Sequence, residues 1–261
     1  MLRRNDNLKN GLNLICDEKD NVYMSVNLLK LNAGQEHVIK DDKKETAALL
    51  LSGTVEFIYE GKTQTCERKD LFRDDAYCLH FSRNKEVKII AKTETEVLIQ
   101  QKENDAEFPT TMYDKTNIDK GYFGDGALKD TTKRQVTTIL DYYRTPWSKM
   151  VIGEIINFPG IWSSYPPHWH PQPEVYFYKF DKPQGFGACF QGEDVYKAVN
   201  NSVALIEGGK THPQCAAPGY AMYYVWMIPH LDGAPWTNIR NFVDEHKWVN
   251  EPDATFFKID K

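Results

Sequence analysis

The sequence predicts an all-β protein built from two similar halves. Short apolar or alternating runs recur along the chain and are separated by turn residues, which is typical of a sandwich or barrel. Convincing helical periodicity is scarce and is limited to residues 114–118 and 238–245. Aromatic residues make up 13% of the chain, which suits an all-β core with pockets.

The predicted strands fall into two groups on either side of a polar stretch. In the first half they cover residues 22–29, 46–51, 54–60, 87–91 and 96–100. In the second half they cover residues 136–140, 149–156, 174–180, 202–206 and 221–227. Residues 101–130 are polar and contain several Gly and Asp, so we interpret them as a partly ordered connection. Since 261 residues suffice for two modest domains, we place an N-terminal domain at residues 1–110, a connecting segment at 111–130 and a second domain at 131–261.

Composition argues against several classes of function. The net charge is −5, from 32 basic and 37 acidic residues without a basic stripe, which argues against nucleic acid as a partner. No apolar run approaches the roughly 20 residues of a membrane span, and no apolar stretch follows the charged start, as it would in a signal peptide. The five cysteines are scattered, odd in number and without a Cys-x-x-Cys pair, which indicates reduced thiols and a cytoplasmic protein.

One set of residues in the second half has the spacing of a metal site. His168 and His170 are two residues apart on an extended segment, so their side chains share a face. Glu174 follows after a short turn, and His212 comes just after a Gly-Gly turn. Three imidazoles and one carboxylate suit one borderline divalent ion, with Zn or Mn as first candidates and Fe or Ni as alternatives. The competing interpretation is a set of satisfied histidines without a metal.

Two segments of the first half can be laid on the segments that carry these ligands. Residues 44–51 match residues 173–178, which places Glu45 on Glu174, and residues 82–87 match residues 207–212. Two halves of one type, of which only the second can bind a metal, is the economical interpretation, and chance similarity between short strands is the alternative. The other histidines are expected to be structural or surface residues: His37, His80, His230 and His246.

A His-x-His pair, a later Glu and a His after a Gly turn form the two-part signature of the cupins, which this chain resembles. The resemblance implies two cupin domains, each a double-stranded β-helix or jelly roll, with the metal only in the second. In more detail, the chain resembles the 5-deoxy-glucuronate isomerases of inositol catabolism and their uronate-isomerase relatives. The segments that carry this resemblance are residues 28–34, 49–55, 162–170, 174–178, 183–187, 209–213, 216–224 and 246–248.

The loop between the His pair and the Glu departs from that pattern. The inositol-pathway enzymes carry a longer loop there, whereas only residues 171–173 intervene in this chain. The short spacing looks more like the 4-deoxy-5-ketouronate isomerases of pectin and uronate breakdown. Because the loop would lie at the mouth of the barrel, both substrates stay open.

The resemblance implies aldose–ketose isomerisation of a small acidic sugar through an enediol. A metal would hold two substrate oxygens, and a base would move the carbon-bound proton. The candidates for proton transfer are Tyr176, Tyr178, Tyr223, Tyr224 and Glu207. Strand parity places Tyr176 and Tyr178 on the face of Glu174, and it allows only one of Tyr223 and Tyr224 to face the pocket.

Lys210 and Arg134 are candidates to bind the substrate carboxylate, and a solvated surface charge is the alternative for each. Two rival functions fit the same ligands: an iron-dependent oxygenase and a non-catalytic sugar-acid sensor. Whether the protein is a homo-oligomer stays open.

Overall fold

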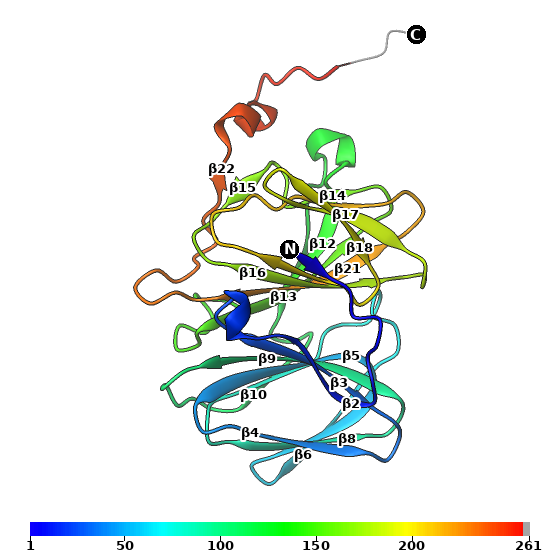
Figure 1. Ribbon diagram of the computed structural model, residues 1–261, viewed down its shortest axis with the longest axis vertical. Helices are drawn as coiled ribbons and strands as arrows, with labels where there is room; N and C mark the ends of the chain where they lie inside the picture. Colours follow the sequence, from blue (N-terminus) through cyan, green and yellow to red (C-terminus); the bar gives the residue numbers. More distant parts are fainter. Residues whose placement is uncertain (258–261) are drawn as a thin grey trace.

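The structure, a computed structural model that describes residues 1–257, consists of two stacked β-lobes (Figure 1). The predicted all-β class is confirmed, since residues 1–257 contain no α-helix. Three short 3-10 helices are present: η1 (Glu18–Asp20), η2 (Ala127–Asp130) and η3 (Asp244–Asn250). The helix predicted at 114–118 is wrong, because that segment forms a turn, and the one predicted at 238–245 overlaps only the start of η3. No helix of residues 1–257 is long and apolar enough to cross a membrane.

The N-terminal lobe is formed by nine strands. They are β2 (Gly11–Cys16), β3 (Ser25–Leu31), β4 (Glu36–Lys40), β5 (Lys44–Tyr59), β6 (Lys62–Arg68), β7 (Cys78–Phe81), β8 (Glu86–Ala91), β9 (Thr95–Glu103) and β10 (Thr111–Tyr113). The long strand β5 joins the strands predicted at 46–51 and 54–60. Its first part pairs with β7 and β9, and its second part pairs with β6 and β8. The change of partner occurs at Gly53, where φ is +96° and a Cβ would lie 2.4 Å from the Glu94 carbonyl oxygen, so only glycine fits there.

The C-terminal lobe contains the remaining strands. They are β1 (Leu2–Arg3), β11 (Asp119–Phe123), β12 (Arg134–Leu140), β13 (Met150–Asn157), β14 (Trp162–Ser163), β15 (His168–Trp169), β16 (Glu174–Phe180), β17 (Phe186–Gln191), β18 (Asp194–Val199), β19 (Val203–Ile206), β20 (Gln214–Ala216), β21 (Met222–Pro229) and β22 (Asn241–Phe242). One sheet has the order β1-β19-β16-β21-β13-β12-β11, and a second has the order β14-β20-β17-β18. Strands β15 and β22 form a separate pair.

Both ends of the N-terminal half differ from the predicted boundaries. Leu2–Arg3 pairs with β19 and therefore extends the C-terminal sheet, and the Met1 amine donates to the Leu205 carbonyl at 3.0 Å. The predicted connection at 111–130 is divided between the lobes, since β10 pairs with β7 and β11 pairs with β12. The chain therefore crosses between the lobes twice.

Each lobe has its own apolar core, and a third apolar cluster fills the space between them. Strand β16 contributes to two of these. Tyr176 and Tyr178 point into the C-terminal lobe, whereas Val175 and Phe177 point toward the N-terminal lobe. The alternation predicted for this strand thus separates a pocket-facing side from a core-facing side.

A buried ion pair crosses the interface between the lobes. Arg68, at the end of β6, contacts both carboxylate oxygens of Glu154 on β13, at 2.5 and 3.0 Å. The Tyr223 hydroxyl donates to the same carboxylate at 2.6 Å. The Arg68 side chain is 1% exposed and that of Glu154 is 6% exposed, so each charge depends on the other for compensation.

Glu45 forms a second polar contact between the lobes. Its carboxylate lies 2.9 Å from His80 Nε2, and it accepts hydrogen bonds from the Ser148 hydroxyl and the Lys149 backbone N–H at 2.9 and 2.6 Å. The proposed overlay of Glu45 on Glu174 is therefore wrong in register. Glu45 points into the interface between the lobes, whereas Glu174 points into the cavity of the C-terminal lobe.

Candidate metal centre

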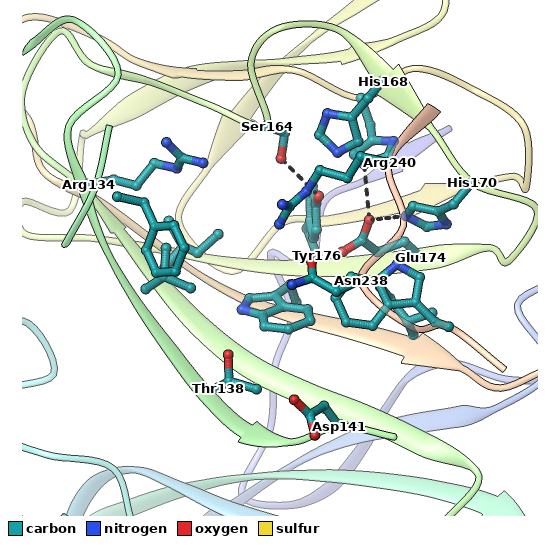
Figure 2. A pocket seen from close by; sticks show the side chains of 17 residues that line it. Arg134, Thr138, Asp141, Ser164, His168, His170, Glu174, Tyr176, Asn238 and Arg240 are labelled. Atoms are coloured by element: carbon teal, nitrogen blue, oxygen red, sulfur yellow. Dashed lines mark hydrogen bonds and ion pairs between the residues drawn. The ribbon is translucent and has the colours of Figure 1, made fainter. Parts of the chain in front are cut away.

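A polar cavity lies within the C-terminal lobe (Figure 2). Strands β12, β13, β16 and β21 form its floor, and the segments around residues 164–170 and 236–240 form its rim. Its lining consists of Phe123, Arg134, Val136, Thr138, Asp141, Ile155, Ser164, His168, His170, Glu174, Tyr176, His212, Trp226, Ile228, Trp236, Asn238 and Arg240.

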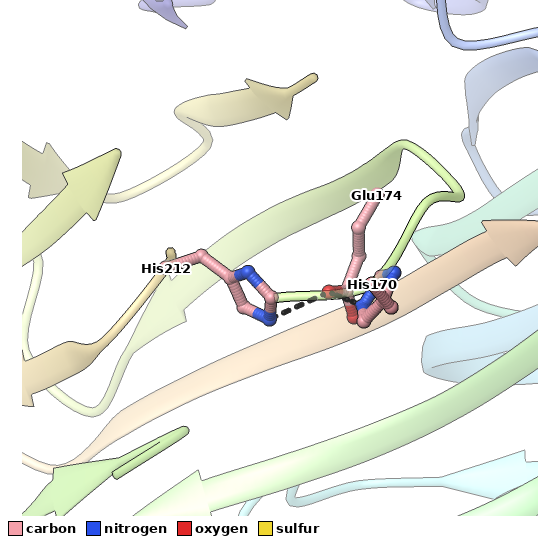
Figure 3. Close-up of side chains that lie close together, drawn as sticks. All are labelled: His170, Glu174 and His212. Atoms are coloured by element: carbon pink, nitrogen blue, oxygen red, sulfur yellow. Dashed lines mark ion pairs between the residues drawn. The ribbon is translucent and has the colours of Figure 1, made fainter. Parts of the chain in front are cut away.

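Three of the four predicted ligands converge in this cavity (Figure 3). The ligand atoms of His170, Glu174 and His212 all lie within 4.8 Å of one another. Glu174 Oε2 is 3.4 Å from His170 Nε2 and 3.3 Å from His212 Nε2. All three side chains are at most 5% exposed, so the group is shielded from bulk solvent.

Hydrogen bonds to the backbone fix the orientation of the histidine rings. Nδ1 of His168, His170 and His212 lies 3.0, 2.9 and 2.9 Å from a carbonyl oxygen two residues away in the chain. Each Nδ1 therefore carries the proton and donates it, which leaves Nε2 with a free lone pair. Burial, and to a smaller extent His212, lowers the pKa of His168 to about 3, and burial lowers the pKa of His212. Both rings are thus neutral at physiological pH, as metal ligands must be.

The fourth predicted ligand, His168, lines the same cavity from the other side of His212. Their ring centroids are 4.9 Å apart, and the rings meet edge to face. Its Nε2 is not part of the compact group of ligand atoms formed by the other three residues.

The donor set fits a divalent ion. Two atoms bound to one tetrahedral ion at about 2.1 Å lie about 3.4 Å apart, which matches the spacing of Glu174 Oε2 from each of the two Nε2 atoms. Imidazole and carboxylate together suit Zn, Mn, Fe or Ni, so the chemistry of the ligands leaves the identity of the metal open.

Gly208 brings the turn that carries His212 against the loop that carries His170. A Cβ at this position would lie 2.0 Å from the Pro171 carbonyl oxygen. The next residue, Gly209, donates its backbone N–H to the His170 carbonyl at 2.8 Å. Ligands that are 42 residues apart in sequence are thus held together by backbone contact.

If this group holds a divalent ion, a Gly208→Ala variant is expected to bind it about 10–100-fold more weakly, the usual cost of disturbing the support of a ligand. The added methyl group forces the turn away from Pro171 and moves His212 with it. Competition with a chelator measures the affinity. Gly121→Ala is the matched control, because no atom lies within 4 Å of its Cβ position and its φ is not positive. Equal affinity in both variants would show that the turn does not position His212.

The four candidate tyrosines occupy different places. Tyr176 lines the cavity, and its hydroxyl lies 3.3 Å from the Ser164 hydroxyl. Tyr178 and Tyr224 are on the same side but lie behind it, bonded to Gln214 at 2.6 Å and Ser163 at 2.7 Å respectively. Tyr223 faces the interface between the lobes, where it contacts Glu154, so of the alternating pair Tyr223 and Tyr224 it is Tyr223 that points away from the cavity side.

The three charged candidates also lie in different places. Arg134 lines the cavity. Glu207 and Lys210 do not: they form an ion pair at 3.2 Å on the turn before His212, with 66% and 41% of their side chains exposed. Turn residues that flank an inward-pointing histidine point outward, which explains why proximity in sequence misled the prediction.

Sequence reasoning missed several lining residues. Trp226 shares parity with Tyr224 on a predicted strand, so it lies on the same side of that strand, but parity alone does not show that this side faces the cavity. Thr138 lies on β12 and Asp141 directly follows it, so both reach the cavity because β12 forms part of its floor. Trp236, Asn238 and Arg240 belong to an irregular segment, of which residues 238–240 were predicted to be helical.

Comparison with known proteins finds relatives that match most of this chain. A model of the KduI/IolB family matches residues 2–249. The chain is 26% identical over 246 residues to the 5-deoxy-glucuronate isomerase of Bacillus velezensis, covering 84% of this chain and 88% of that protein. It is also 26% identical over 271 residues to the 5-deoxy-glucuronate isomerase of Bacillus licheniformis, covering 94% of this chain and 95% of that protein.

Solved structures share the fold. An IolB-like protein from Salmonella typhimurium LT2 superposes with a TM-score of 0.85 at 21% identity, covering 96% of this chain and 99% of that chain. The oxalate decarboxylase of Lactobacillus farciminis superposes with a TM-score of 0.65 at 11% identity, covering 97% and 88%. At these identities the likeness concerns the fold alone, and it confirms the cupin-type architecture predicted from the sequence.

Proposed function

Because the chain belongs to the KduI/IolB family, we propose that it isomerises a deoxy-uronic acid sugar with the help of one divalent metal ion. The first candidate substrate is 5-deoxy-glucuronate, which the names of the relatives favour and which would place the protein in inositol catabolism. The second is a 4-deoxy-5-ketouronate, because of the short loop at residues 171–173. A cytoplasmic location remains a prediction from the sequence.

His168, His170, Glu174 and His212 would hold the ion, with Zn or Mn as first candidates. When bound, it would act as a Lewis acid and template for the carbonyl and hydroxyl oxygens of the substrate. The observation that carries the proposal is the buried His170–Glu174–His212 group, in which backbone hydrogen bonds aim two Nε2 atoms at one carboxylate oxygen. Such an arrangement, without a bound cation, would leave lone pairs facing one another in a buried site.

Tyr176 is the proposed proton donor beside this group. Burial raises its pKa well above the usual value for tyrosine, so the hydroxyl stays protonated at neutral pH. It is therefore suited to donate a hydrogen bond or a proton to a substrate oxygen, and not to act as a resting phenolate base. The Ser164 hydroxyl, 3.3 Å away, is a hydrogen-bond partner for it.

The test is product analysis by proton NMR on both candidate substrates, with the metal content measured in the same sample. Conversion of either to its aldose–ketose isomer by metal-loaded protein is expected. If metal-loaded protein converts neither substrate, the isomerase proposal is wrong. Oxygen consumption in the same sample would indicate an oxygenase, and tight binding without turnover would indicate a sensor.

A Tyr176→Phe variant is expected to lower kcat by about 10²–10⁴-fold, the usual contribution of a positioned proton-transfer group. KM should change little, because only the hydroxyl is lost. Tyr178→Phe is the comparison: it lies on the same side of β16, but its hydroxyl donates to Gln214 outside the cavity lining. Turnover that falls equally in both variants would indicate a packing effect and would rule out a specific role for Tyr176.

A further inference from the structure

Residues 231–242, which we call the strap, close one side of the cavity. The Trp236 backbone N–H donates to His230 Nδ1 at 3.0 Å, and the Gln172 side chain donates to the Ala234 carbonyl at 2.7 Å. At its far end the strap becomes β22, which pairs with β15, the strand of His168. The strap is therefore anchored directly on the segments that carry the candidate metal ligands.

Three alternate residues of the strap line the cavity: Trp236, Asn238 and Arg240, of which the last two are labelled in Figure 2. Arg240 lies at the mouth, where it remains exposed, and Arg134 on β12 is half-buried on the opposite side. In Figure 2 both guanidinium groups point toward the middle of the cavity. Burial is the main cause that lowers the pKa of Arg134, and the positive charge of Arg240 lowers it further. The two guanidinium groups therefore interact electrostatically.

Neither arginine forms an ion pair within residues 1–257. Within residues 1–257, the one hydrogen bond of the Arg134 side chain goes to the Thr132 carbonyl at 2.9 Å, and its Nε is buried without a partner. The carboxylates of the cavity are engaged elsewhere: Glu174 faces two histidines, and Asp141 accepts the Arg144 backbone N–H at 2.9 Å.

Two tryptophans add further donors to the same space. The indole N–H groups of Trp226 and Trp236 are buried and have no acceptor within the described chain, although both residues line the cavity. Unpaired buried donors are costly, so a ligand rich in oxygen acceptors is the natural partner of this surface. Two guanidinium groups that face each other across it favour an anionic ligand.

We propose that Arg240 and Arg134 together bind the carboxylate of a sugar acid and determine that the enzyme selects acids over neutral sugars. A guanidinium pairs with a carboxylate through two parallel hydrogen bonds, which a neutral hydroxymethyl group cannot reproduce. The identity of the reacting sugar acid rests on the proposed isomerase function, whereas the carboxylate site itself is testable without turnover.

The test uses two ligands that cannot isomerise and that differ at one carbon. D-Gluconate carries a carboxylate where sorbitol carries a hydroxymethyl group. Calorimetric titration of the metal-loaded wild type is expected to show at least about 10-fold tighter binding of gluconate, since a charge-assisted hydrogen bond adds this much. Arg240→Gln and Arg134→Gln should each weaken gluconate binding about 10–100-fold and leave sorbitol binding and metal content unchanged.

The control is Arg73→Gln, since Arg73 is 82% exposed and lies in the N-terminal lobe. It should bind gluconate like the wild type. The proposal is overturned if the wild type fails to prefer gluconate over sorbitol, or if Arg240→Gln keeps that preference. If the protein converts neither uronate but prefers gluconate over sorbitol, and this preference is lost in Arg240→Gln, the isomerase function is refuted and the carboxylate site is retained.

Discussion

Replacing His212 by alanine is expected to release the bound metal and to lower turnover by more than about 100-fold. Loss of a residue that merely supports a ligand costs about 10–100-fold, so loss of the ligand itself should exceed this range. The variant leaves Glu174 beside only one imidazole of the compact group. Elemental analysis of the purified variant gives the metal content, and kcat/KM on the active substrate gives the loss in turnover.

His246→Ala is the control for this experiment. His246 lies in η3, outside the cavity lining, and its side chain is 42% exposed. It should keep both the metal and the activity of the wild type. Wild-type turnover by a metal-free His212→Ala protein would contradict the proposed metal centre.

Replacing Arg68 by methionine is expected to lower the free energy of unfolding by about 3–5 kcal/mol. Removal of one partner of a buried ion pair leaves the other charge uncompensated, and a loss of this size is typical. Here Glu154 would remain in the interface between the lobes with only the Tyr223 hydroxyl as a donor. Equilibrium unfolding in urea, followed by circular dichroism, measures the change.

Two further variants identify the cause. Arg68→Met combined with Glu154→Gln should recover part of the loss, because the second change removes the stranded charge. Lys40→Met should cost less than about 1 kcal/mol, since its partner Glu86 and Lys40 itself are both about 60% exposed. If Arg68→Met costs no more than Lys40→Met, the ion pair does not stabilise the contact between the lobes.

The parts of the site that could be predicted from the sequence are those that depend on local alternation. Along β16 a period of two is sufficient to place Glu174 and Tyr176 on one side and Val175 on the other. The same rule shows that Tyr223 and Tyr224 face opposite ways. It does not show which of the two faces the cavity, because that depends on which neighbouring sheet covers each side.

The parts that could not be predicted depend on contacts between distant segments. The strap was predicted only in part, as a helix from residue 238, whereas its irregular path is set by contacts such as that of Gln172 with Ala234, 62 residues away. The overlay of Glu45 on Glu174 failed for a related reason. A shift of one residue reverses every side chain of a strand, and short apolar segments do not fix the register.

The two faces of β16 also bear on how this protein changes over evolutionary time. The N-terminal lobe contributes no side chain to the cavity lining. Substitutions in that lobe would therefore be expected to leave catalysis unchanged. Yet Phe177 packs in the cluster shared with that lobe, on the strand that begins with Glu174. A substitution that repacks this cluster displaces the backbone of a ligand. Residues of the N-terminal lobe that contact this cluster are therefore expected to be constrained together with the residues of the cavity.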